Sequence, residues 1–74
     1  MLRDLIDFRV GARHAEIMAA QADIEELAAS IQVGLADEGL VLPRQDVESA
    51  LIEIKRSGGS RKELVDAVLR MVET

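Results

Sequence analysis

Residues 12–38 read ARHAEIMAAQADIEELAASIQVGLADE, and this stretch decides the fold that the sequence predicts. It contains no proline, and its only glycine is Gly34. Branched apolar residues recur every seven positions, a spacing that places them on one face of an α-helix. They are Val10, Ile17, Ile24 and Ile31. Gly39 then stands where glycine usually caps a helix end. We therefore predict one long helix over about residues 12–38.

Two shorter helical patterns follow the long one. Pro43 fits the first turn of a helix over about residues 43–57, because its missing N–H costs no hydrogen bond there. Ser60 and Glu63 have the spacing of a capping box, which predicts the start of a helix over about residues 60–73. Each pattern is apolar on one face. A glycine-containing turn separates the two, so the sequence predicts a helix-turn-helix pair.

The first eleven residues give a mixed pattern. Residues 2–6 place leucine and isoleucine at helical spacing, whereas Ile6, Phe8 and Val10 alternate with charged residues as in a strand. A lone strand has nothing to pair with here except the same segment of a second copy. We therefore prefer a helix that continues into the long one through Gly11, with a strand as the alternative.

The predicted long helix is apolar on two opposite sides when residues are placed at about 100° per position. One side carries isoleucine and leucine, and we expect it to receive the other two helices. The opposite side carries small apolar residues, and we expect it to face outward and bind a partner. These residues are Ala12, Ala15, Ala19, Ala22, Ala29, Val33 and Ala36. The alternative is that alanine stands there only because it is the best helix former.

The chain is short for the apolar surface that it carries. With 74 residues it forms one small domain, and such domains bury only about 60% of the surface that the unfolded chain exposes. It has no cysteine, so no disulfide can add stability. The apolar arc of the last helix is also wider than one neighbour covers. We therefore predict an all-α fold that self-association, most simply as a dimer, completes into a helical bundle.

Composition and charge restrict the compartment and the partners. Apolar residues make up 49% of the chain, which is typical of a folded protein, yet no apolar run is long enough to span a bilayer. The chain does not start like a secretory signal and has no cysteine, so we expect a cytoplasmic protein. The net charge of −5 lies in residues 1–42, where three arginines stand against eight acidic residues. Nucleic acids and anionic membranes should repel the chain as a whole.

No pattern typical of a catalytic site appears. His14 is the only histidine, and helical spacing places it on a polar strip that should face solvent. Ser60 has a structural role as a helix cap, and Ser30 has no histidine within local reach. Metal and nucleotide motifs of recognised spacing are missing as well. We therefore predict no enzyme, no metal site and no cofactor.

Four basic residues surround the predicted turn between the last two helices: Lys55, Arg56, Arg61 and Lys62. The helix dipole disfavours cations at a helix N-terminus, so we expect an acidic group to meet Arg61 and Lys62. The preferred function is stoichiometric protein binding by an adaptor, chaperone-like factor or inhibitor. The alanine face would occlude or bridge the partner, and the turn would add an electrostatic contact. The alternative is a small nucleic-acid-binding transcriptional regulator that uses Arg61 and Lys62.

Overall fold

The computed structural model describes residues 1–73, and the regular structure of this part of the chain is entirely helical. The elements in chain order are α1 (Leu2–Arg9), the 3₁₀ turn η1 (Gly11–Arg13), α2 (His14–Met18), α3 (Ile24–Asp37), α4 (Arg44–Ser57) and α5 (Arg61–Glu73). The prediction of an all-α fold is confirmed. None of the described helices combines the length and the apolar character that crossing a bilayer requires.

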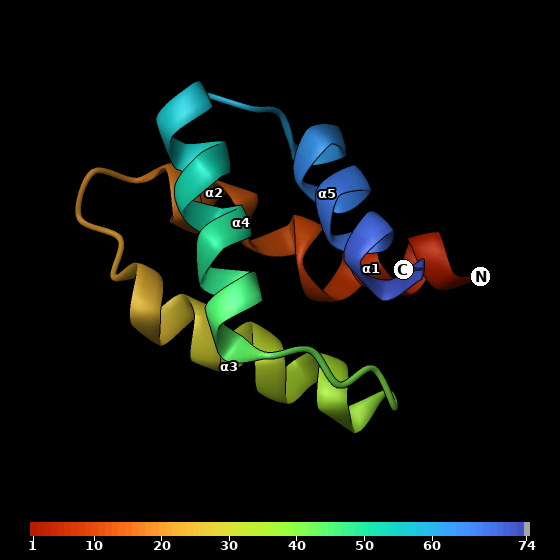
Figure 1. Ribbon diagram of the computed structural model, residues 1–74. Helices are drawn as coiled ribbons and strands as arrows, with labels where there is room; N and C mark the ends of the chain where they lie inside the picture. The colour runs from red at the N-terminus through yellow and green to blue at the C-terminus, as the bar shows by residue number, and fades with distance from the viewer. Residues whose placement is uncertain (74) are drawn as a thin grey trace.

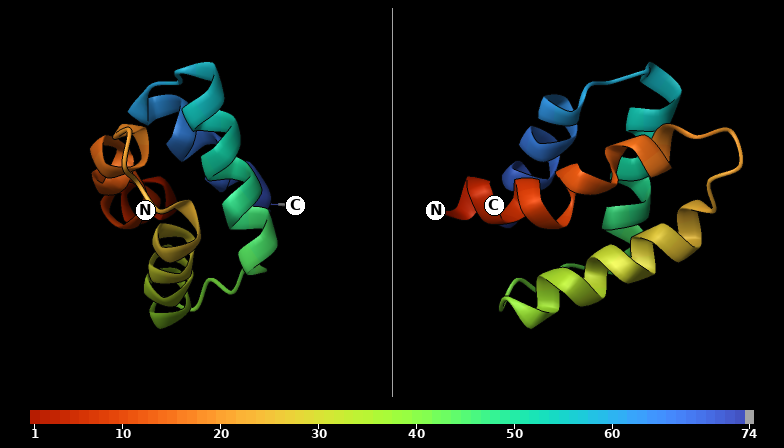
Figure 2. Two further views of the ribbon diagram at one scale, coloured as in Figure 1. Left: turned by 90° about the vertical axis from the view of Figure 1, so that its left-hand side faces the viewer. Right: turned by 180° about the vertical axis from the view of Figure 1, so that it is seen from behind.

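The helices surround one core within an envelope of 31 × 21 × 19 Å. Helices α1 and α2 run in the same general direction, and the chain then reverses so that α3 returns beneath them (Figures 1 and 2). Helix α4 packs on α3 and contacts α2, whereas α5 packs on α1 and η1. The helix-turn-helix pair α4–α5 therefore covers the N-terminal half of the chain.

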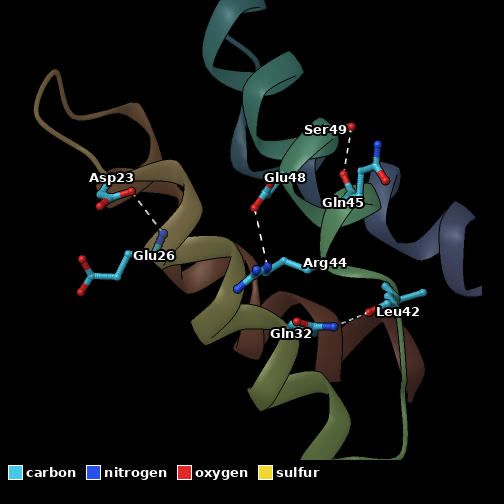
Figure 3. Close-up of polar contacts among 8 residues, drawn as sticks. All are labelled: Asp23, Glu26, Gln32, Leu42, Arg44, Gln45, Glu48 and Ser49. Atoms are coloured by element: carbon cyan, nitrogen blue, oxygen red, sulfur yellow. Dashed lines mark hydrogen bonds and ion pairs between the residues drawn. The ribbon is translucent and has the colours of Figure 1, made fainter.

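The predicted single helix over residues 12–38 is wrong. The chain leaves the helical conformation at Ala19, where φ is −64° and ψ is 142°. Asp23 is also extended, and its side chain accepts a hydrogen bond of 3.2 Å from the backbone N–H of Glu26 (Figure 3). Asp23 is therefore the N-cap of a new helix, α3, in the middle of the stretch that was expected to be continuous.

The size of the core explains the break. A straight helix over residues 12–38 would be about 40 Å long, which exceeds the longest dimension of the molecule, 31 Å. The reversal lets the seven-residue repeat serve one core from several directions. Val10 and Ile17 are fully buried, Ile31 is nearly so, and Ile24 packs against them from a partly buried position. The apolar repeat thus marks core positions in separate segments.

The predicted helix ends are confirmed where glycine and serine define them. Gly39 has φ 82°, and the N–H of Leu40 donates a hydrogen bond of 2.8 Å to the carbonyl of Leu35. This is the Schellman arrangement of a helix C-terminus. The hydroxyl of Ser60 accepts a hydrogen bond of 3.2 Å from the N–H of Glu63 at the start of α5. Both signals are local, and tertiary packing leaves them in place.

The core includes side chains from every helix. The buried apolar residues are Ile6, Val10, Ile17, Leu27, Ala28, Ile31, Leu35, Leu42, Val47, Ala50, Leu51, Ile54, Leu64, Val65 and Val68. Along α5, Leu69, Met71 and Val72 pack against this core from partly buried positions. The wide apolar arc of α5 is therefore covered largely within one chain, which removes one reason for expecting self-association.

The connection between α3 and α4 is held against α3 by a side chain. Gln32 donates a hydrogen bond of 3.0 Å from Nε2 to the carbonyl of Leu42 (Figure 3). Leu42 itself is buried in the core. The glutamine therefore satisfies a backbone acceptor next to the apolar anchor of the connection, which fixes where α4 begins.

Replacing Asp23 by alanine tests the break. Loss of the N-cap should lower the free energy of unfolding by about 1 kcal/mol, measured by urea denaturation. If the chain were helical through this position, the same change would raise stability, because alanine is the better helix former. Asp37→Ala is the matched control: this exposed carboxylate ends α3, where the helix dipole does not favour it, so its loss should cost nothing. Equal losses in the two variants would contradict the cap.

Candidate interaction surfaces

The small residues predicted to form one outward face occupy separate segments. They are Ala12 in η1, Ala15 in α2, Ala19 and Ala22 in the connection that follows, and Ala29, Val33 and Ala36 in α3. Most are exposed, and Val33 keeps 60% of its surface accessible. The prediction of one continuous stripe along one helix is wrong, because the reversal at residues 19–23 separates its two halves.

A groove lies where α2, the α2–α3 connection and the first half of α3 meet. We call it the α2–α3 groove, and its volume is about 450 Å³. Its apolar lining comes from Ala19, Ala22 and Leu27, and its polar lining from Arg13, Glu16, Gln21, Asp23, Glu26 and Ser30. Two of the alanines expected to bind a partner thus line this groove. The other five residues of that set do not.

The N-terminal end of α3 is acidic. Asp23, Glu25 and Glu26 stand together there, and α3 contains no basic residue. Within residues 1–73 none of these carboxylates belongs to an ion pair, whereas Glu16 is paired with Arg13 at 3.7 Å. The helix dipole favours acidic groups at this end, which accounts for their presence. The carboxylate of Glu26 projects away from α4 (Figure 3).

The basic residues around the α4–α5 turn divide into two kinds. Arg61 donates from Nε and a terminal nitrogen to the two carboxylate oxygens of Asp7, each at 2.9 Å. The acidic group expected to meet Arg61 thus comes from α1 of the same chain. Lys55, Arg56 and Lys62 take part in no ion pair within residues 1–73. Arg56 and Lys62 are exposed, and Lys55 is half-buried.

The contact between α1 and α5 is electrostatic at its edge. The hydrogen bond from Arg61 lowers the pKa of Asp7 below its usual range, and the positive charges of Arg61 and Arg3 act in the same direction. Asp7 in turn raises the pKa of Arg61. Arg3 also forms an ion pair with Asp66 of α5. Two ion pairs therefore cross the same helix–helix contact.

Gly11 permits this close approach. A Cβ atom at Gly11 would lie 2.6 Å from Oδ1 of Asp7 and 3.0 Å from a side-chain carbon of Val65. Neither neighbour can move easily, because the carboxylate is held by Arg61 and Val65 belongs to the core. The predicted continuation of the first helix through Gly11 is wrong: α1 ends at Arg9, and η1 begins at Gly11.

His14 has a structural contact that the sequence did not suggest. We expected it to face solvent, yet it is half-buried and its Nε2 lies 2.7 Å from the carbonyl oxygen of Gly59. An Nε2 proton can be donated to that carbonyl, which joins the start of α2 to the α4–α5 turn. Among residues 1–73, no group of three or more histidine, aspartate or glutamate side chains is placed to hold a metal ion.

Phe8 is an exposed apolar residue that the sequence analysis did not select. It keeps 68% of its surface accessible, and the guanidinium carbon of Arg9 lies 5.5 Å from the centre of its ring. Arg9 also pairs with Glu38 at 2.8 Å, which joins α1 to the end of α3. Its three-residue spacing from Leu5, which is half-exposed, was the available signal, because the two share one face of a helix.

No protein-family model matches this chain, and neither the curated proteins nor the solved structures yield a match. Function therefore has to be argued from the surfaces described above.

Replacing Asp7 by asparagine tests the contact between α1 and α5. Because its pKa is lowered in the folded state, the ionised carboxylate stabilises the fold above the usual carboxyl pKa of about 4. That stabilisation disappears as the pH falls through the lowered value. Asp7→Asn should therefore melt at a lower temperature than the parent at neutral pH, with the difference vanishing in acid. Thermal unfolding followed by circular dichroism across pH measures both.

Asp4→Asn is the control for this experiment. Asp4 lies on the same helix, is exposed and takes part in no ion pair within the described residues. Its loss should leave the melting temperature nearly unchanged at every pH. If the two variants behave alike, the pairing of Asp7 with Arg61 does not stabilise the fold.

Proposed function

We propose that this protein acts without catalysis, by stoichiometric binding of a protein partner, and that the α2–α3 groove receives a basic amphipathic segment of that partner. The observation that carries the proposal is the lining of the groove. Apolar surface from Ala19, Ala22 and Leu27 lies beside the carboxylates of Asp23 and Glu26, which no cation of the described chain neutralises.

Lysine and arginine side chains fit this lining in both of their parts. Each has an apolar stem that can cover Ala19 and Leu27 while its charged end stays at the rim with Asp23 and Glu26. Charge complementarity at a rim directs encounter and excludes acidic competitors. A basic segment held here would be occluded from other partners, which is the action of an adaptor, a chaperone-like factor or an inhibitor.

Nucleic-acid binding through the α4–α5 turn has less support. Arg61, one of the two residues expected to contact phosphates, is engaged by Asp7 on both oxygens. Lys62 remains, but α5 also exposes Glu63 and Glu73, which would repel a phosphate backbone. A single available cation among carboxylates is weak recruitment for a polyanion.

Charge reversal at Glu26 tests the proposal. The probe is a fluorescently labelled amphipathic peptide of lysine and leucine, with a glutamate-for-lysine peptide as the negative probe. Glu26→Lys should weaken binding of the lysine peptide by about tenfold or more, since it places a cation at the rim of the groove. The backbone N–H of Glu26, not its side chain, bonds to Asp23, so the cap survives the change.

Glu53→Lys is the matched control, measured by the same anisotropy titration. It makes the same change of net charge on an exposed position of α4 outside the groove. Its affinity should stay within about twofold of the parent, as expected of a rim charge that is not in the contact. Equal weakening in the two variants would mean that the peptide responds to net charge only, and the groove would then not be the binding site.

A further inference from the structure

The charges of this chain that have no intramolecular counterpart are sorted by sign into two surfaces. We define the acidic surface as Asp23, Glu25 and Glu26, beside the α2–α3 groove, and the basic surface as Lys55, Arg56 and Lys62, around the α4–α5 turn. Neither set contributes an ion pair within residues 1–73. Each surface therefore presents three like charges at neutral pH with nothing to balance them.

The turn that carries the basic surface is held in place. Gly58 has φ 68°, a left-handed conformation that ends α4, and a Cβ atom at Gly59 would lie 2.9 Å from Cδ1 of Ile54. The carbonyl of Gly59 is also bound by His14 at 2.7 Å. The cations therefore stand on backbone that is already ordered, and binding through them loses little conformational entropy.

The same turn adds apolar surface to its charge. Ile52 of α4 is 44% exposed and lies together with Arg56 and Ser57 on the outer side of α4. Arg56 and Lys62 bring apolar stems of their own. The turn is thus a basic amphipathic element, which is the chemistry that the α2–α3 groove fits.

We infer that the occupant of the α2–α3 groove is the α4–α5 turn of a second copy of this chain. The inference rests on the proposed function of the groove and names its partner. Three uncompensated carboxylates meet three uncompensated cations, so the contact is matched in charge. The two surfaces are unlike, and a pair of copies related by a two-fold axis would form the contact twice. Two linked contacts raise the affinity above that of either alone.

This contact differs from an apolar dimer seam in its response to salt. The Debye length falls from about 30 Å at 0.01 M ionic strength to about 3 Å at 1 M. Self-association should therefore be strongest at low salt and weaken at least about tenfold at high salt. Sedimentation velocity over a range of protein concentrations at both ionic strengths measures the dissociation constant.

Two charge reversals and their mixture locate the contact. Glu26→Lys and Lys62→Glu should each weaken self-association about tenfold or more. An equimolar mixture of the two variants should associate again, since the unchanged turn of the first meets the unchanged groove of the second. Glu53→Lys and Arg44→Glu repeat the two charge changes elsewhere on α4 and should associate like the parent. Circular dichroism confirms that each variant is folded.

The outcomes separate this inference from the proposed function. A chain that stays monomeric at low salt at every concentration overturns the second copy as occupant, as does association that both reversals leave unchanged. If that monomer still binds the lysine peptide through Glu26, the groove keeps its proposed function with another partner. Failure of peptide binding alone, with charge-dependent self-association intact, would instead mean that the groove accepts only its own turn.

Discussion

The hydrophobic core depends on the reversal of the chain at residues 19–23. Val10 and Ile17 precede this reversal and Ile31 follows it, yet all three are buried in one cluster. A rod of helix about 40 Å long could not place them there, because the molecule measures 31 Å at most. The second helical pair then closes over the folded N-terminal half, and α5 covers its own wide apolar arc against that half. A chain of this size thus covers its apolar side chains by bending, where a longer helix would need a second chain.

The position of α1 depends on contacts between segments far apart in the sequence. Ile6 anchors the helix in the core, Arg61 holds Asp7 from α5, and Arg9 reaches Glu38 at the end of α3. Gly11 allows the chain after α1 to lie against α5 closely enough for these contacts to form together. Exposed ion pairs contribute little one at a time. Their value here is to specify which neighbours α1 packs against, in addition to the burial that holds it there.

The sequence predicts those features whose causes are local. Gly39, Gly58 and the Ser60–Glu63 pair mark helix ends because their geometry needs only neighbouring residues. The break at Ala19 could not be predicted in that way, since the residues around it are good helix formers and Asp23 with Glu26 also fits a continuous helix. Core size, a property of the whole chain, decides between those two interpretations. The same limit applies to the surfaces: Ala19 and Ala22 were selected for a stripe that does not exist, and they line a groove that only the reversal creates.

The pairing of charges within the chain determines which charges remain for recognition. Arg61 stands at a helix N-terminus, where the dipole disfavours it, and its bond to Asp7 offsets that cost inside the molecule. Lys62 occupies the same end without such a partner among the described residues, and Glu26 lies unpaired at the opposite surface. Since isolated surface charges stay solvated at little cost, their presence alone implies no function. Segregation by sign is different: it gives each surface a field that a partner of opposite sign can use, and the groove adds apolar area only beside the acidic one. Recognition of a basic amphipathic element follows from that coincidence, and the chain itself carries one.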